Sequence, residues 1–267
     1  MSDNAVLHSS EFKLRRFFNW FPLGLTYALL YMGRYNLTVS KNALGDLMSK
    51  ADFGEIFGIG AVVYAFSFLV NGPLVDRIGG KKGMLIGALG ACIMNVLMGV
   101  YLYYVLSLDN PASAPLTGVY IVLYSINMYF QSYGAVSIVK VNSNWFHVRE
   151  RGTFSGIFGV MISSGLYLAF SVTPFILARD FVKGQGFNGG DALWWVFFSP
   201  AILLFSFFIL EVFLLKDRPS QAGHEDFDTC DASSGENLEA SVPTLELFKR
   251  ILTHPVIIVV AFIEFCT

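Results

Sequence analysis

Five stretches of this sequence run for about 20 residues without an Asp, Glu, Lys or Arg side chain. One α-helix needs about 20 consecutive apolar residues to cross the hydrocarbon core of a bilayer, and soluble cores rarely contain even one such run. The five stretches are Phe57–Val75, Met84–Leu108, Pro111–Val139, Gly152–Ala178 and Ala192–Leu210. A sixth, Phe17–Gly33, is interrupted by Arg34 and resumes with Tyr35–Ser40. We therefore predict an all-α membrane protein built as a bundle of six transmembrane helices.

The composition excludes the other broad classes of protein. Charged residues make up 14% of the chain and hydrophobic residues 54%, whereas soluble domains carry roughly 25% charged residues. The formal net charge of -2 gives no basic excess that would indicate nucleic acid as a partner. Cys92, Cys230 and Cys266 lack the spacing of metal ligands, so we expect free thiols and no metal. The sequence has no Ser-His-Asp or nucleotide-binding constellation, so we predict neither an enzyme nor a cofactor.

The distribution of Lys and Arg predicts the orientation of the bundle. With the N-terminus placed in the cytoplasm, the inside segments hold twelve of the 18 basic residues and the outside loops hold four. The other two, Arg34 and Lys140, lie within spans. Cytoplasmic loops of membrane proteins carry the excess of Lys and Arg. Both ends of the six-helix unit are therefore expected to face the cytoplasm.

The same reading divides the chain into four parts. Residues 1–16 form a cytoplasmic tail and residues 17–215 the six-helix domain. Residues 216–254 are polar and acidic, which predicts a mobile cytoplasmic linker with a short surface helix at Thr244–Leu252. Residues 255–267 are apolar but too few to span a bilayer. We expect them to be the start of a seventh helix.

Two loops carry a recognisable pattern, and the first lies between the second and third spans. Residues 72–82 read GPLVDRIGGKK, and the pattern residues are Gly72, Asp76, Arg77, Gly79 and Lys81. Gly72 and Gly79 permit a tight turn and a close approach of helices. Asp76 can cap a helix N-terminus or pair with a nearby Arg. The pattern resembles the loop signature of the major facilitator superfamily.

The second loop lies between the fourth and fifth spans. Residues 145–153 read WFHVRERGT, which resembles the loop found at the same place in that superfamily. The charges of this loop, carried by Arg149, Glu150 and Arg151, can hold the cytoplasmic side closed, with Arg149 or Arg151 as the partner of Asp76. His147 is expected to be a surface loop residue. The resemblance implies that the chain is the N-terminal half of a major facilitator fold.

One face of the first span combines charge with aromatic hydroxyls. Tyr27, Tyr31, Arg34 and Thr38 are spaced 4, 3 and 4 apart, so they share one side of a helix. An Arg inside a membrane is costly and faces a cavity or a partner. Its planar fork suits phosphate, because it donates two parallel hydrogen bonds and keeps its proton. The face therefore predicts a site for an anion.

This face is similar to the first helix of the organophosphate:inorganic phosphate antiporters, which include glycerol-3-phosphate and hexose-phosphate transporters. The resemblance implies that Tyr27, Tyr31, Arg34, Tyr64 and Lys140 bind the substrate. It also implies a second Arg from a C-terminal half that this sequence lacks, and it places the protein in a bacterial inner membrane.

Two positions depart from the glycerol-phosphate carriers. Phe68 stands where they have a Lys, and Ile162 stands where they have a His. Glycerol-3-phosphate itself is therefore the least favoured substrate within the family.

The leading hypothesis is a secondary transporter that exchanges a phosphorylated metabolite for inorganic phosphate by alternating access. No Asp or Glu lies in the middle of a span, and this absence favours anion exchange over proton symport. One alternative is a carrier of organic acids or sugar acids in the same superfamily. The other is a sugar-phosphate sensor that does not transport. The partners are the anionic solute, inorganic phosphate, the lipid bilayer and the other half of the carrier.

The sequence favours a structural role at some further positions, or leaves it open beside a role in binding. Lys140 is as well placed to reach the headgroups as to bind a ligand. Asn127 and Gln131 share a face of the fourth span, where hydrogen bonding between helices is favoured over a role in the cavity. Residues with small side chains let helices approach closely. Packing contacts are therefore expected for the glycines at positions 83, 87, 152, 156 and 159.

Overall fold

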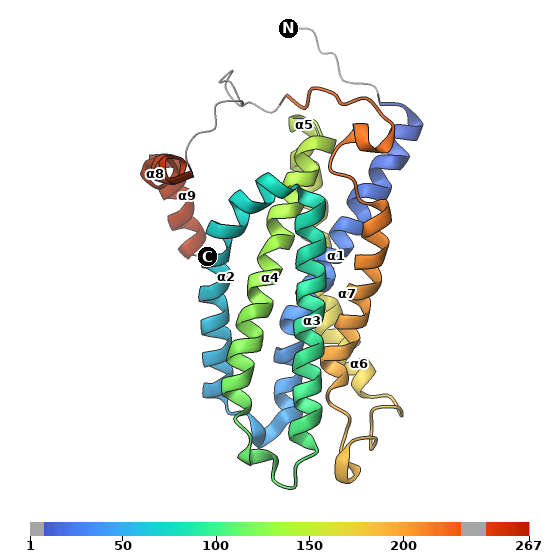
Figure 1. Cartoon of the computed structure of the whole chain (residues 1–267), viewed down its shortest axis with the longest axis vertical. Coiled ribbons are helices and arrows are strands. Elements are labelled where there is room, and N and C mark those ends of the chain that lie inside the picture. Colours follow the sequence, from blue (N-terminus) through green and yellow to red (C-terminus); the bar gives the residue numbers. More distant parts are fainter. Residues whose placement is uncertain (1–7, 231–243, 267) are drawn as a thin grey trace. The chain divides into compact units, whose positions relative to one another are not determined.

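The structure is a computed structural model that describes residues 8–230 and 244–266. It divides into two units, residues 1–229 and 230–267, and each is treated by itself. The first unit is a bundle of helices that run alternately up and down (Figure 1). Its helices are α1 (Ser10–Leu44), α2 (Lys50–Ile78), α3 (Gly80–Leu106), α4 (Leu116–Trp145), α5 (Val148–Tyr167), α6 (Thr173–Leu177) and α7 (Trp195–Leu214).

Helices α5 and α6 form one continuous helical stretch. A π-helical turn at Leu168–Val172 joins them. Pro174 follows at the start of α6, and proline cannot donate a backbone hydrogen bond. The wider turn lies just before this missing donor, and π-helix occurs mostly as single turns inside α-helices.

Four helical stretches of the described chain are long and apolar enough to cross a membrane. They are Lys50–Ile78, Gly80–Leu106, Val148–Leu177 and Trp195–Leu214. Helices α1 and α4 are as long, with 35 and 30 residues, but their composition is more polar. The two helices that fall short on apolar content are the two that carry Arg34, Asn127 and Gln131.

Helix α1 is the centre of the packing in the first unit. It contacts α3, α4, α5 and α7, while α2 packs on α4 and α3 packs on both α4 and α7. Two separate apolar cores result. One contains Phe12, Trp145 and Phe146 at the end where α1 begins. The other contains Leu44 and Phe53 at the opposite end. Polar side chains in the interior of α1 and α4 lie between these cores.

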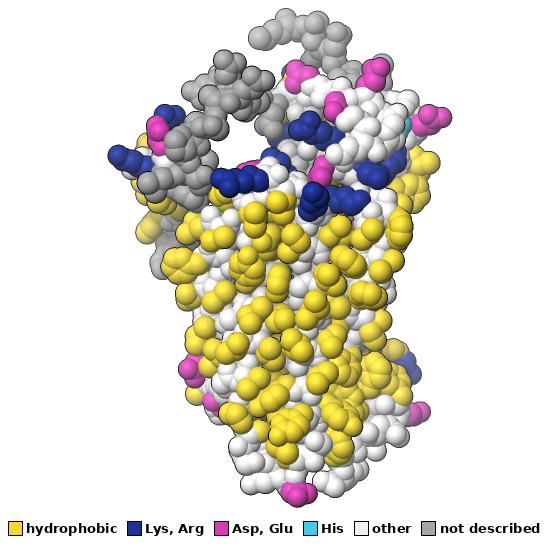
Figure 2. All heavy atoms as spheres, viewed as in Figure 1, with side chains coloured by type: hydrophobic (Ala, Val, Ile, Leu, Met, Phe, Trp, Pro, Cys, Tyr) yellow, Lys and Arg dark blue, Asp and Glu magenta, His cyan; other side chains and the backbone are white. Residues whose placement is uncertain are grey.

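The outer surface of the first unit matches a lipid environment. Large apolar side chains such as Val62, Phe66, Val160 and Phe213 are more than half exposed. On the face shown in Figure 2, hydrophobic side chains cover the middle of the bundle, and most Lys and Arg side chains gather at the end where α1 begins. The α2–α3 and α4–α5 loops lie at this same end because the helices alternate in direction.

The glycines behave in two different ways. A Cβ atom at Gly83 or Gly87 would press against α4, as expected of packing glycines. At Gly152, Gly156 and Gly159 a Cβ would meet nothing within 4 Å, so the prediction of packing contacts there is wrong. The sequence gives the identity of these glycines but not which face of α5 is covered.

Of the two glycines in the first loop pattern, Gly79 behaves as expected and Gly72 does not. Gly79 has a φ of 93°, and a Cβ there would be 2.7 Å from an Asp217 carboxylate oxygen. Gly79 therefore serves both the turn and the close approach. Gly72 lies inside α2, where a Cβ would meet nothing within 4 Å. The expected close approach at Gly72 is absent from the described residues.

Residues 216–229 are held against the bundle rather than extended as a linker. The Asn19 side chain donates to the Lys216 carbonyl and accepts from its N–H, at 3.1 and 2.8 Å. Trp145 Nε1 donates to the same carbonyl at 3.0 Å. The Val148 N–H donates to the Thr229 carbonyl at 2.9 Å. The prediction of a mobile segment is therefore wrong for this part, and residues 231–243 of the predicted linker lie outside the described residues.

The described residues of the second unit form two helices. Helix α8 (Thr244–Thr253) occupies the region where the sequence predicts a short helix, and α9 (Pro255–Cys266) occupies the apolar segment that follows. In α8, the Arg250 side chain pairs with Glu246 one turn earlier, at 2.8 Å.

We expect Gly165→Ala to destabilise the bundle. A methyl group at Gly165 would collide with the backbone carbonyl oxygen of Ala28 in α1, and backbone cannot yield as a flexible side chain can. Overpacking of this kind costs about 1–3 kcal/mol. Thermal unfolding of the purified chain would show a lower midpoint for this variant. The control is Gly156→Ala on the same helix, where the new methyl group meets nothing within 4 Å. Equal midpoints for the two variants would contradict the packing described.

Candidate functional site

Arg34 lies inside the bundle, in the second half of α1, and is only 8% exposed. Its Nε atom donates a hydrogen bond of 2.9 Å to Oε1 of Gln131 in α4. Its guanidinium carbon lies 4.6 Å from the ring centroid of Tyr31 and 4.3 Å from that of Tyr64. Two aromatic faces and one amide therefore surround the cation, an arrangement that attracts it through the ring quadrupoles.

Tyr27 extends this cluster along α1. Its ring packs edge-on against Tyr31 with centroids 5.2 Å apart. Tyr64, from α2, also packs against Phe68 at 4.8 Å. The structure thus brings together four of the side chains predicted to bind substrate, three from α1 and one from α2. The sequence favours hydrogen bonding between helices for Gln131, and this is confirmed, because its bond with Arg34 joins α4 to α1. The sequence signal is its position on a polar face of α4.

The backbone near Arg34 is fixed by a second set of polar contacts. Asn36 donates to Asn95 Oδ1 of α3 at 2.7 Å and to the Val196 carbonyl of α7 at 3.4 Å. The Tyr124 hydroxyl donates to the Arg34 carbonyl at 3.3 Å. Helices α1, α3, α4 and α7 are therefore tied together within half a turn of the cation. Such bonds between helices add rigidity where the surroundings are apolar.

The cluster retains hydrogen-bond donors without partners. Arg34 Nη2 and Gln131 Nε2 are buried and lack an acceptor within the described residues. In that part of the chain no carboxylate forms an ion pair with Arg34. A buried cation that lacks a counter-ion is strongly unfavourable, and an added anion would reverse that cost. The arrangement can therefore hold an anionic group by charge and by two neighbouring donors.

Lys140 is not part of this cluster. Its Nζ atom forms an ion pair with Asp76 at 2.7 Å, and both side chains are at least one-third exposed. The expectation that Asp76 pairs with Arg149 or Arg151 is therefore replaced by a pair between α2 and α4. Arg151 donates instead to the carbonyls of Ser143 and Phe146, at 2.9 and 3.3 Å.

Glu150 joins the start of α5 to the first turns of α1. It accepts hydrogen bonds of 2.9 and 3.3 Å from both terminal nitrogens of Arg16, whose guanidinium carbon also lies 4.6 Å from the Phe146 ring centroid. Bidentate pairs of this kind are the stronger ones. Burial, with the Arg16 charge nearby, lowers the pKa of His8. His147 caps the start of α5 by accepting from the Arg149 N–H, a role beyond the expected surface loop residue.

The rest of the first loop contacts the segment after α7. The Lys81 N–H donates to Asp217 Oδ1 at 2.7 Å, so Asp217 occupies the N-terminus of α3. The Lys81 side chain donates to the Val212 carbonyl, also at 2.7 Å. Arg77 is exposed. Sequence reasoning did not identify Asp217, because it is 136 residues from its partner and its polar neighbours resemble a linker.

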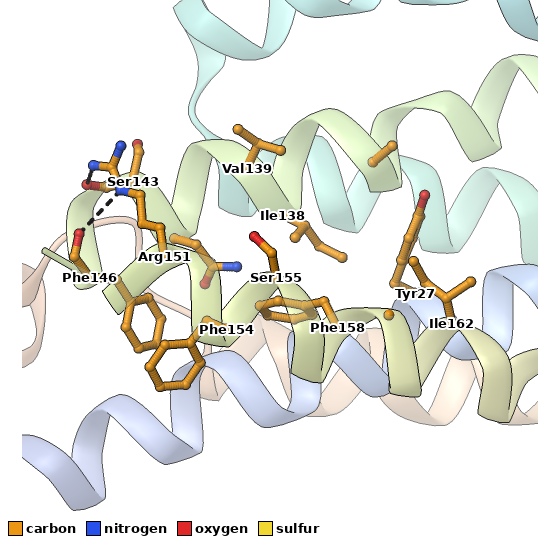
Figure 3. A pocket seen from close by; sticks show the side chains of 13 residues that line it. Tyr27, Ile138, Val139, Ser143, Phe146, Arg151, Phe154, Ser155, Phe158 and Ile162 are labelled. Carbon is orange, nitrogen blue, oxygen red and sulfur yellow. Dashed lines mark hydrogen bonds between the residues drawn. The ribbon is translucent and has the colours of Figure 1, made fainter. Parts of the chain in front are cut away.

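A pocket adjoins the cluster at Tyr27. It has a volume of about 400 Å³ and lies between α1, α4 and α5. Figure 3 shows Tyr27 at one end of the pocket and Arg151 at the other, with Phe154 and Phe158 along one wall. No group of three or more His, Cys, Asp or Glu residues that could hold a metal ion occurs in the described part of the chain.

Several known proteins are similar to this chain in sequence. The glycerol-3-phosphate transporter of Bacillus subtilis is 25% identical over 242 residues, which cover 88% of this chain and 50% of that protein. The membrane sensor protein UhpC of Escherichia coli is 28% identical over 130 residues, 48% of this chain and 27% of the sensor. A probable hexose phosphate transport protein of Chlamydia trachomatis is 23% identical over 219 residues, 81% of this chain and 43% of that protein.

The chain spans about half the length, or less, of these curated relatives. The family model described as the Major Facilitator Superfamily matches residues 23–267, which include the Arg34 cluster and both loops. Transporters of this kind are not enzymes. This protein is a multi-pass integral membrane protein that belongs to the major facilitator superfamily.

Proposed function

We propose that this chain is the N-terminal half of a secondary transporter that exchanges a phosphorylated metabolite for inorganic phosphate. The observation that carries the proposal is the buried Arg34 guanidinium, which has aromatic and amide neighbours but no carboxylate partner in the described structure. A phosphate monoester supplies the missing negative charge and acceptors for the free donors. The names of the relatives support a phosphate ester as the solute class.

Exchange, rather than proton symport, is supported by the location of acidic groups. The described bundle has one fully buried carboxyl side chain, Glu211, and it lies in the last turn of α7. Asp52 and Glu55 of α2 are not buried. Proton-coupled carriers use titrating acids at membrane depth. The Arg34 cluster contains no such acid, which favours a fixed positive charge that binds one anion in exchange for another.

The proposal includes six spans and a second half. The spans are α1, α2, α3, α4, the α5–α6 stretch and α7, with α9 as the start of a seventh. Six further helices would supply the second cation and move against this half, since such carriers place the substrate between two related halves. We further propose that the N-terminus is cytoplasmic and that the membrane is a bacterial inner membrane.

A non-transporting sensor is the second candidate, because one of the relatives is a membrane sensor protein. A transporter shows counterflow of labelled solute into phosphate-loaded vesicles, whereas a sensor binds the same ligand without counterflow. A carrier of organic or sugar acids would show counterflow that inorganic phosphate does not inhibit.

Arg34→Lys is expected to weaken phosphate binding at least tenfold. Lysine keeps the positive charge but loses the planar fork and the Nε contact with Gln131. Hydrogen bonds to charged groups are worth about 1.5–3 kcal/mol each. Equilibrium binding of labelled phosphate to the carrier measures the effect, with Arg77→Lys at an exposed position in the last turn of α2 as the control. Undiminished affinity in the Arg34 variant would refute the proposed site.

Cysteine substitutions are expected to report the proposed topology. Single cysteines at Lys50 and Lys183 should react with an impermeant thiol reagent added outside intact cells. Cysteines at Lys82 and Arg151 should react only after permeabilisation, because the helices alternate and place these positions at the opposite end. The reverse labelling pattern would contradict a cytoplasmic N-terminus.

Asp76→Asn is expected to lower the rate of exchange while leaving equilibrium affinity nearly intact. Asp76 pairs with Lys140 at an exposed end of the bundle, away from the Arg34 cluster. Lys140→Gln should give the same defect, and the double variant should be no slower than either single one. Rates of phosphate exchange and binding curves measure the two quantities. A large loss of affinity in either variant would contradict a purely conformational role.

A further inference from the structure

The pocket between α4 and α5, which we name the α4–α5 pocket, is mostly apolar. Its walls include Ile138, Phe154, Phe158 and Ile162. Of its polar side chains, Ser143 and Arg151 lie toward the end away from Tyr27, and Ser155 lies between the two ends. Arg151 contacts two backbone carbonyls at its end. Beyond Tyr27, a ligand would therefore first meet aromatic and aliphatic side chains.

The α4–α5 pocket is linked to the Arg34 cluster by the contacts of two tyrosines. Tyr27 lines the pocket and packs on Tyr31, and Tyr31 lies against the Arg34 guanidinium. Seven residues separate Tyr27 from Arg34 along α1, which corresponds to roughly 10 Å of helix. An anion held at Arg34 would reach the pocket only if its uncharged part were of about that length.

We infer that the α4–α5 pocket binds the apolar body of an elongated phosphate monoester whose charged head is held at Arg34. The inference rests on the proposed function, since it needs an anion at Arg34. It narrows the solute class to amphipathic phosphates, with an alkyl or aryl part that extends past Tyr27. A short polyol phosphate would leave the pocket unfilled.

The two departures from the glycerol-phosphate carriers agree with this class. Ile162 lines the pocket, and Phe68 packs on Tyr64 beside the cation. Both are apolar where those carriers have a basic residue. Apolar walls gain free energy from burying hydrocarbon, whereas they leave a hydroxyl group without its hydrogen bonds. The lining therefore selects against a body rich in hydroxyls.

The test is a series of unbranched alkyl phosphates, from ethyl to decyl phosphate, below their micelle concentrations. The purified chain is placed in lipid nanodiscs, and each compound displaces labelled inorganic phosphate. Ethyl and butyl phosphate should bind about as well as inorganic phosphate. Once the chain passes Tyr27, each further methylene should improve affinity about fourfold. An affinity that does not depend on chain length would overturn the inference.

A substitution that fills the pocket distinguishes binding of the alkyl chain in the pocket from its binding in the surrounding lipid. Gly159 lines the pocket, and a Cβ there meets nothing within 4 Å, so Gly159→Leu extends a side chain into this space. This variant should lose at least tenfold in affinity for decyl phosphate, whose chain passes Tyr27, and keep its affinity for inorganic phosphate. Gly156→Leu is the control, because its position on α5 is equally open and does not line the pocket. It should behave as the unmodified chain.

Each contrary result has a different meaning. Absence of inorganic phosphate binding overturns the proposed function together with this inference. Phosphate binding with the same chain-length response in both glycine variants overturns the inference alone, because the gain then comes from the bilayer. Equal binding of decanol and decyl phosphate, unaffected by Arg34→Lys, would show a lipid-filled groove and would also overturn it.

Discussion

A buried guanidinium in the middle of an apolar bundle constrains which helices of this structure can be apolar. Arg34 satisfies one of its donors on Gln131 and places its flat faces against Tyr31 and Tyr64. Because α1 and α4 carry this polar layer, they cannot be as apolar as their neighbours. The remaining long helices are apolar enough to cross a membrane. The difference in polarity among the helices thus follows from the cost of holding one charge at membrane depth.

The charged side chains at the end where α1 begins differ from Arg34, because several of them have partners of opposite charge. The pairs Asp76–Lys140 and Arg16–Glu150 join helices, and Asp217 holds the N-terminus of α3. Both side chains of the Asp76–Lys140 pair are at least one-third exposed, and exposed pairs contribute little to stability, typically about 0–1 kcal/mol, whereas the Arg16 side chain of the other pair is buried. Pairs that contribute so little can break and re-form at small cost. A pair of this kind suits the alternating access proposed above, in which this end opens and closes, whereas the Arg34 layer keeps its geometry.

Sequence patterns predict what depends on local spacing. The apolar runs gave the helices, and spacing of 4 and 3 placed Tyr27, Tyr31 and Arg34 on one face, where the structure has them in contact. Partners that come from distant segments were not predictable. Lys140 pairs with a residue 64 positions away, and Asp217 lies in a stretch whose composition suggested a linker. A helical period specifies a face of one helix, but the helix that covers that face depends on the whole packing.

The open glycines of α5 illustrate the same limit in another way. Small residues in a membrane helix allow close packing, yet Gly152, Gly156 and Gly159 have no neighbour within 4 Å of a Cβ. The side of α5 that carries Gly159 lines the α4–α5 pocket, while Gly165, deeper in the helix, meets α1 directly. The same residue type therefore leaves space at one height of the helix and removes it at another. Space beside the pocket and close contact beneath it are both needed, because a cavity persists in a membrane bundle only where the helices around it are fixed elsewhere.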